Sequence, residues 1–285
     1  MSTTEPSVRF RPMITTDLIR AHELSRALRW PHRLQDWQWM HQISQGVIAE
    51  DTAGLLGTAL CFLQGDYASV GLVIIAAERQ GQGLGRKLLD QTLVQVQART
   101  PILVATPRGA PLYASQGFTT YEHILQHQAA SAPSLPDYEP PTGHVLQAVN
   151  PQDFQQLLEL GSAATGMDRT RVLSALLEIS QSVMGMKRDQ QWVGFALLRP
   201  FGHGLAIGPV VAESIEEAKA MIATLLSQAA GQFIRLDVTQ RSGLGDWLSE
   251  IGIPQVDDVA QMAKGAPPSS CGNAVQMALA NQALC

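Results

Sequence analysis

Three glycines at alternate positions separate an apolar run from an amphipathic helical pattern. The run covers residues 70–75, and apolar residues then recur at helical spacing from Leu84, which predicts a helix over residues 84–96. Between them the chain reads Gln80-Gly81-Gln82-Gly83-Leu84-Gly85-Arg86. Glycine adopts a positive φ at little cost, so these glycines can turn several main-chain N–H groups toward one point. The free N–H groups and the dipole of the new helix reinforce that point, which predicts a phosphate-binding turn.

The glycine positions distinguish this turn from two common phosphate-binding motifs. The dinucleotide-binding fingerprint G-x-G-x-x-G requires a third glycine where Arg86 stands. The P-loop G-x-x-x-x-G-K-[ST] also requires glycine at Arg86, and it requires serine or threonine at Leu88. The turn therefore matches neither motif, although Arg86 and Lys87 supply positive charge beside it.

The turn instead resembles motif A of the GNAT acetyltransferases, Q/R-x-x-G-x-G/A, with Gln80, Gly83 and Gly85 at its defining positions. Further along, a second segment is similar to the late motif of the same family, L-Y-x-x-x-G-F. It reads Leu112-Tyr113-Ala114-Ser115-Gln116-Gly117-Phe118. The resemblance implies an N-acetyltransferase with acetyl-CoA as cosubstrate and no metal, in which an amine attacks the thioester directly in a ternary complex.

The resemblance also assigns the cofactor contacts. It implies that the strand before the turn splays from its neighbour and pairs with the pantetheine arm at Val73, Ile74 and Ile75, like an added strand. The predicted catalytic groups are the Ile75 N–H, which would polarise the thioester carbonyl, and the Tyr113 hydroxyl, which would donate to the leaving thiolate. A structural tyrosine packed on the sheet is the alternative for Tyr113. The predicted cofactor-binding residues are Val73, Ile74, Ile75, Gln80, Gly81, Gln82, Gly83, Leu84, Gly85, Arg86 and Tyr113.

A segment after the first predicted helix combines aromatic, imidazole and carboxylate groups, and it lies where the family shapes its acceptor pocket. The predicted substrate-binding residues are Trp30, His32, Asp36, Trp37 and, from the second half, Arg199. The alternative interpretation makes Trp30 and Trp37 core anchors, His32 a surface residue and Arg199 an ordinary strand-end group. The base that deprotonates the amine stays unassigned, because the strand before the turn carries no carboxylate.

A stretch rich in Pro, Ser and Ala divides the chain near its middle and is typical of an exposed linker. The two halves repeat one order of elements: a helix start, strand-like runs, a long amphipathic helix and a further strand. We predict strands at 46–49, 57–63, 70–75, 102–105, 192–198, 205–211 and 233–238, and long helices at 84–96 and 218–226. The expected fold is α/β (α+β), with two tandem GNAT-like domains, each a twisted mixed β-sheet flanked by helices. The predicted units are a catalytic acetyl-CoA-binding domain (1–130), a linker (131–142) and a degenerate domain (143–285).

The second half lacks the glycine-rich turn. Glu213, Glu216 and Glu217 stand at the corresponding helix start, where they suit the helix dipole but repel a diphosphate. Leu248 occupies the place of the tyrosine. Segments such as residues 194–200 and 207–212 resemble the C-terminal domain of YitH-type tandem GNAT proteins, which implies a domain that helps to close the acceptor site.

Composition limits the class of protein, its partner and its compartment. Hydrophobic residues make up 45% and charged residues 16% of the 285 residues, which is typical of globular proteins. A net charge of −5 disfavours nucleic acid as a partner, and no apolar run reaches the roughly 18 residues of a membrane span. Residues 1–12 lack the apolar core of a signal peptide, and the cysteines form no metal-binding pair. We therefore expect a cytoplasmic monomer or homodimer whose partner is a small-molecule amine.

Two further functions fit the same residues. Because no base is evident, the chain could be an acyl-CoA-responsive binding or regulatory protein without efficient turnover. It could also be an acyltransferase for longer acyl chains, which depends on the depth of the pocket near Val73 and Leu112.

Overall fold

The computed structural model describes residues 7–136 and 138–285. Residues 1–6, from the segment predicted not to be a signal peptide, and Asp137 of the predicted linker lie outside the described residues. Over the described residues the chain forms eight α-helices. They are α1 (Leu18–Ala27), α2 (Leu34–Gln42), α3 (Leu84–Val96), α4 (Ala110–Ser115), α5 (Phe154–Thr165), α6 (Thr170–Ile179), α7 (Ile215–Gln228) and α8 (Leu244–Glu250).

The described strands all belong to one mixed sheet. They are β1 (Arg9–Pro12), β2 (Gln45–Asp51), β3 (Gly54–Gln64), β4 (Tyr67–Ile75), β5 (Thr100–Ala105), β6 (Thr119–Ala129), β7 (His144–Ala148), β8 (Ser182–Arg188), β9 (Gln191–Phe201), β10 (Gly204–Ala212), β11 (Ile234–Thr239), β12 (Gln255–Ala263) and β13 (Val275–Leu279). Their order across the sheet is β1-β2-β3-β4-β5-β12-β6-β11-β13-β10-β9-β8-β7. The predicted mixed α/β architecture is confirmed, and every predicted strand and long helix is present.

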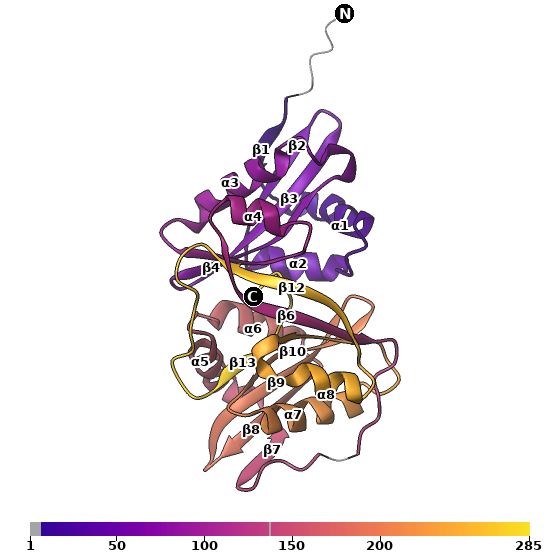
Figure 1. The fold of residues 1–285 in the computed structure, drawn as a ribbon, viewed down its shortest axis with the longest axis vertical. Coiled ribbons are helices and arrows are strands. Elements are labelled where there is room, and N and C mark those ends of the chain that lie inside the picture. Colours follow the sequence, from indigo (N-terminus) through magenta and orange to yellow (C-terminus); the bar gives the residue numbers. More distant parts are fainter. Residues whose placement is uncertain (1–6, 137) are drawn as a thin grey trace, which may run out of the picture.

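The two halves are joined by exchanged strands. β12, from the second half, pairs with β5 of the first half, and β6, from the first half, pairs with β11 of the second. β12 and β6 also pair with each other, so they cross the middle of the molecule side by side (Figure 1). Sequence patterns did not predict β6 or β12 because both alternate irregularly and carry many polar residues.

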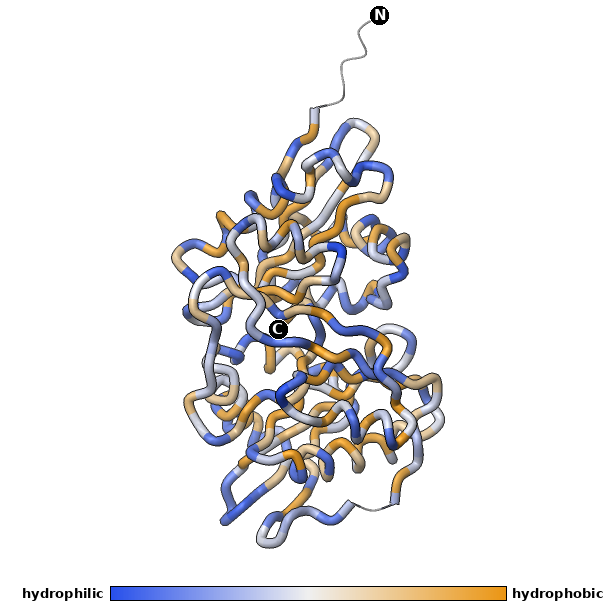
Figure 2. Tube along the Cα trace, viewed as in Figure 1, coloured by the Kyte–Doolittle hydropathy of each residue, from blue (hydrophilic) through white to orange (hydrophobic). Residues whose placement is uncertain are grey.

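Helices cover both faces of the sheet, and apolar residues divide between these faces. In the first half, Ile74 points into the core under α1 and α2, whereas Ile75 packs with Leu84 and Leu88 of α3. In the second half, α5 and α6 lie on one face and α7 and α8 on the other. The core under α2 continues into that under α5 and α6, so the two halves share apolar packing. Figure 2 shows apolar stretches along the inner strands and hydrophilic stretches at many outer turns.

The segment after β13 runs through the middle of the molecule, where the C label stands in Figure 1. Arg169, buried at the start of α6, donates to the carbonyl oxygens of Leu284 (2.9 Å) and Cys285 (3.0 Å). Gly71 of β4 lies directly against Ala283, since a Cβ built on Gly71 would come within 2.6 Å of the Ala283 Cα. No helix of the described residues has the length and apolar character to cross a membrane.

Candidate active site

The glycine-rich turn adopts the geometry that its sequence predicts. Gly81 and Gly83 have positive φ angles of 76° and 75°, and Gly83 is the N-cap of α3. A Cβ built on either residue would meet no atom within 4 Å, so the main chain borders open space. The side-chain amide of Gln80 donates to the Ile75 carbonyl at 2.9 Å, which ties the turn to the end of β4. The first-turn N–H groups of α3 are therefore free to bind an anion.

β4 separates from β5 beside this turn. The two strands pair in parallel only from Tyr67–Val70 with Thr100–Leu103, so the rest of β4 has an unpaired edge. A register shift against β3 marks the place, and Leu72 there has a φ of 51°. Thr58 holds this bulge, because its hydroxyl donates to the Leu72 carbonyl at 3.0 Å. Bulges bend strands in this way next to functional sites.

The opening forms a cavity of about 510 Å³, which we call the loop cleft. Its lining residues come from the unpaired edge of β4, the turn and the α4 region. They are Leu28, Trp30, Val73, Ile74, Ile75, Gln80, Gly81, Gly85, Thr106, Arg108, Gly109, Leu112 and Tyr113. Most predicted cofactor-binding residues therefore line one cavity. Of the other four, Leu84 is buried in the core and Gly83 is the N-cap of α3. The Gln82 side-chain oxygen accepts from Arg79 at 3.0 Å, and Arg86 donates to the Ser115 hydroxyl at 2.9 Å.

Tyr113 lies at the wall of the loop cleft. Its ring is 8% exposed and packs edge-on against Phe118 with ring centroids 6.0 Å apart. Its hydroxyl makes no hydrogen bond to any described residue. Burial raises the pKa of Tyr113 to about 12, so the hydroxyl stays protonated at neutral pH and can act as a donor.

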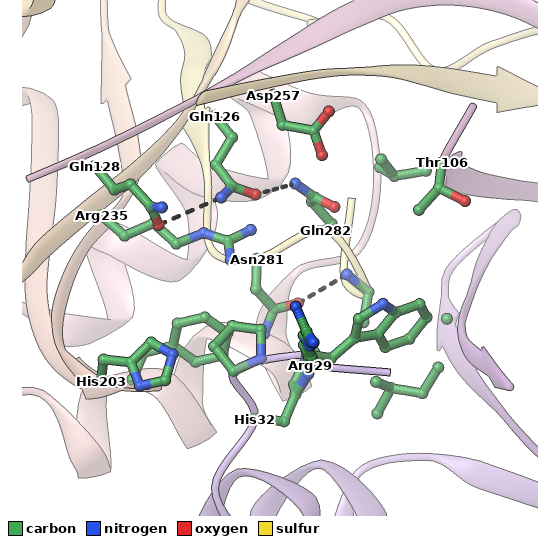
Figure 3. A pocket seen from close by; sticks show the side chains of 17 residues that line it. Arg29, His32, Thr106, Gln126, Gln128, His203, Arg235, Asp257, Asn281 and Gln282 are labelled. Carbon is green, nitrogen blue, oxygen red and sulfur yellow. Dashed lines mark hydrogen bonds between the residues drawn. The ribbon is translucent and has the colours of Figure 1, made fainter. Parts of the chain in front are cut away.

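A second cavity, of about 300 Å³, lies where the two halves meet, and we call it the central cavity. Strands from both halves supply its walls together with the loop after α1, the β9–β10 turn and the segment after β13. Its polar lining, drawn in Figure 3, comprises Arg29, His32, Thr106, Gln126, Gln128, His203, Arg235, Asp257, Asn281 and Gln282. Trp30 and Thr106 line both cavities, so the central cavity and the loop cleft adjoin at this shared wall.

The predicted substrate-binding residues fall into two groups. Trp30 and His32 line the central cavity, where burial lowers the pKa of His32 to about 4 and keeps the ring neutral. Asp36 and Trp37 do not line either cavity. Asp36 is fully buried and accepts hydrogen bonds from Arg33 at the start of α2, and the Trp37 ring nitrogen donates to Ser25 at 3.1 Å.

Arg199 also lies beneath the central cavity and not in its lining. It is fully buried and donates to the carbonyl oxygens of Gly208 and Ala280. Burial lowers the pKa of Arg199 to about 10. Its position next to Ala280 lets it support the segment that walls the cavity.

Sequence reasoning missed most polar groups of the central cavity. Gln126, Gln128, Arg235 and Asp257 lie on strands that are far apart in the chain and meet only through the strand exchange. Arg108, a cation in the loop cleft, was also missed, although its position between β5 and the Leu-Tyr motif could have suggested it. The described residues contain no group of three or more His, Cys, Asp or Glu placed to hold a metal ion.

A sheet that opens beside a glycine-rich helix start is the arrangement expected of the GNAT acyltransferases. The chain belongs to this family, because family models described as acetyltransferase (GNAT) domain match residues 42–120 and 157–274. It is 30% identical over 258 residues to YitH, an uncharacterized N-acetyltransferase of Bacillus subtilis, covering 86% of this chain and 90% of the relative. The chain is therefore a tandem GNAT protein.

Solved structures share the fold over nearly the whole length. A protein from Pyrococcus horikoshii matches with a TM-score of 0.79 at 18% identity, covering 98% of this chain and 96% of the other. A tandem GNAT protein from the clavulanic acid biosynthesis pathway matches with a TM-score of 0.63 at 13% identity, covering 91% and 99%. At these identities the likeness concerns the fold alone.

Proposed function

We propose that the protein transfers an acetyl group from acetyl-CoA to the amine of a small molecule by direct attack in a ternary complex. The observation that carries the proposal is the shared wall at Trp30 and Thr106, because it lets an acyl donor in the loop cleft meet an acceptor in the central cavity. Both cavities have the size and mixed lining that are typical of small-molecule sites.

The loop cleft fits the cosubstrate. The diphosphate would lie on the free N–H groups of the turn at Gly81 and Gly83, where no side chain fills the space. Arg108 adds positive charge from the opposite wall. The pantetheine arm would pair with the unpaired edge of β4 at Val73 and Ile75 as an added strand, running from the turn toward the bulge at Leu72.

The chemistry then needs a donor for the sulfur. The amine nitrogen attacks the thioester carbon, the C–S bond breaks, and the proton lost by nitrogen finally resides on the thiol. A main-chain N–H such as that of Ile75 would stabilise the charge on the carbonyl oxygen. The Tyr113 hydroxyl, with a pKa of about 12, is a far weaker acid than a thiol of pKa about 8.5. Tyr113 therefore acts as a hydrogen-bond donor to the thiolate and does not give up its proton.

The second half supplies walls for the acceptor and not a second cofactor site. At the start of α7 the Ser214 hydroxyl accepts from the Glu217 N–H at 3.3 Å, so the helix caps itself. The Glu217 carboxylate also accepts from the Glu213 N–H at 2.8 Å. Carboxylates at this helix start would repel a diphosphate.

A thiol-release assay tests the proposal. The purified protein is mixed with acetyl-CoA and a panel of small amines, and free CoA is measured together with the acetylated amine. Release that depends on the amine supports the proposal, and parallel assays with octanoyl-CoA define the acyl group. Tight acetyl-CoA binding without release for any amine would refute it.

One observation favours a second function, an acyl-CoA-responsive binding protein. The lining of the loop cleft among the described residues contains no Asp or Glu that could act as a base. A binding protein would change its stability or its oligomeric state with acetyl-CoA while the thiol-release assay stays at background.

A further inference from the structure

At the far end of the central cavity, away from the loop cleft, four polar side chains lie on one face of two paired strands, and three of them, Arg235, Gln126 and Gln128, line the cavity. Arg235 and Asp237 are two residues apart on β11, so their side chains lie on the same face of the sheet. In the register of the two strands, Arg235 lies opposite Gln128 of β6, and Asp237 lies opposite Gln126. Directly opposed side chains in an antiparallel pair are close enough to contact a common ligand. Figure 3 shows Arg235 and Gln128 together at the end of the cavity opposite Thr106.

Asp237 pairs with only part of the Arg235 side chain. The Nε and Nη2 atoms of Arg235 donate to Asp237 at 2.9 to 3.2 Å, whereas Nη1 makes no hydrogen bond to any described residue. The Arg235 side chain is more than nine-tenths buried, and its Cζ atom lies 5.4 Å from the centroid of the Phe201 ring. The structure thus holds a guanidinium in place with one edge free toward the cavity.

Beside Arg235, three glutamine side-chain amides are linked by hydrogen bonds, and this series also ends in a free donor group. The Gln282 Nε2 atom lies 3.4 Å from an Asp237 oxygen, and because a carboxylate only accepts, this atom must be the donor nitrogen. Gln282 then donates to Gln126 at 3.1 Å, and Gln126 donates to Gln128 at 3.4 Å. The orientation of each amide fixes the next, so the NH₂ group of Gln128 is left without a partner among the described residues. Two sets of N–H groups therefore face one small volume.

The charged residues of the lining make the two ends of the cavity different. Asp257 of β12 lies between β5 and β6 in the sheet, so it stands closer to the shared wall than Arg235 does. Three strand spacings of about 4.8 Å separate β5 from β11, which leaves on the order of 10 Å between the shared wall and the donors. Arg29, exposed at the cavity rim, adds a further cation.

From this arrangement we propose that the acceptor is an amine that carries a carboxylate several bonds away, bound by the free edge of Arg235 and the NH₂ group of Gln128. The inference rests on the proposed acetyl transfer, because the amine is taken to lie at the shared wall. Planar carboxylates match the guanidinium edge, and hydrogen bonds to charged groups are stronger than those to neutral ones.

A matched series of acceptors tests the carboxylate. The acceptors carry the amine at the end of the chain opposite the variable group. Aminohexanoate, aminohexanol and diaminohexane then have the same length and differ only in that group, and aminobutanoate with aminobutanol gives a shorter pair. We expect kcat/KM for the amino acid to exceed that for the alcohol of equal length by about ten-fold or more. Equal or higher values for the alcohol at both lengths would overturn the inference while leaving acetyl transfer intact.

Gln128→Glu is the informative variant, because it keeps the shape and replaces the donor by a carboxylate. The preference should shift from aminohexanoate toward diaminohexane by about ten-fold or more, and an unchanged ratio contradicts the inference. Gln91→Glu makes the same chemical change on the exposed face of α3 and should leave the ratio as in the wild type. Arg235 itself is not substituted, because its removal would leave the Asp237 carboxylate buried without its ion-pair partner and would destabilise the fold.

Failure of the proposed function has a separate signature. If acetyl-CoA binds but no amine is acetylated, calorimetry on the CoA-loaded protein compares aminohexanoate with aminohexanol directly. Tighter binding of the amino acid supports the carboxylate site on its own, and equal affinity overturns it.

Discussion

Removal of the Tyr113 hydroxyl tests the role of this residue at the sulfur. The substitution Tyr113→Phe removes one oxygen that has no hydrogen-bond partner among the described residues, and the ring stays packed against Phe118. No partner is stranded, so the change in the free energy of unfolding should stay within about 0.5 kcal/mol. A loss of rate in this variant must then come from the missing hydroxyl at the reacting atoms and not from unfolding of the protein.

The raised pKa sets the size of that effect. Full proton transfer from a phenol of pKa about 12 to a thiolate of pKa about 8.5 is uphill by roughly 4.8 kcal/mol. A hydrogen bond to the charged sulfur contributes about 1.5 to 3 kcal/mol instead. Tyr113→Phe should therefore lower kcat by roughly 10- to 150-fold, with little change in acetyl-CoA affinity.

The same pKa predicts the pH dependence. Because the hydroxyl stays protonated below its pKa, the ratio of wild-type to Tyr113→Phe rates should be constant from about pH 7 to about pH 10. Stopped assays of acetylated amine at saturating acetyl-CoA measure this ratio. A rate loss below three-fold, or a ratio that falls toward one as the pH rises through this range, would refute the reasoning.

Tyr121→Phe provides the matched control. Tyr121 is another largely buried tyrosine whose hydroxyl has no partner among the described residues, but it lines a different cavity from the loop cleft. Its pKa is also raised, chiefly by burial. The control variant should keep the wild-type rate, so that a loss in both variants would point to a general effect of removing a buried hydroxyl.

Substitutions at three further positions probe the turn, the cavity wall and the buried imidazole. Gly83→Glu should abolish acetyl-CoA binding in calorimetry, and wild-type affinity of this variant would contradict the assignment. Gly83→Ala should only strain the folded protein through the positive φ, at a cost of about 1 to 2 kcal/mol in stability. Gly71→Ala should push Ala283 and the wall of the central cavity, which raises KM for the amine but not for acetyl-CoA and costs about 1 to 3 kcal/mol of stability. The pKa of His32 is about 4 in the folded protein and near 6.5 unfolded, so only the unfolded chain gains a proton between these values, and stability falls as the pH drops through them. Urea unfolding at about pH 5 and pH 7 should show a smaller pH effect for His32→Gln than for the wild type, and equal pH effects would exclude His32 as the cause.

Local patterns predicted the part of the site that one stretch of chain builds. The turn at Gly81 and Gly83, the strand before it and the helix after it are adjacent in sequence, so glycine spacing and apolar periodicity were sufficient. The same patterns put Asp36 among the predicted substrate-binding residues, whereas in the structure its carboxylate lies outside both cavity linings and accepts hydrogen bonds from Arg33 at the start of α2. Whether Tyr113 and Ile75 act in catalysis stays a prediction.

The amino-acid sequence alone determined the glycine-rich turn, the family and the repeated order of elements, since these depend on residues within a few turns or strands of each other. The tertiary structure decided where the central cavity, the proposed acceptor site, lies. Arg235 and Gln128 are more than a hundred residues apart and become neighbours only because β6 leaves its own half to pair with β11. Strand pairing over such separations depends on the packing of the whole sheet, and no local spacing encodes it.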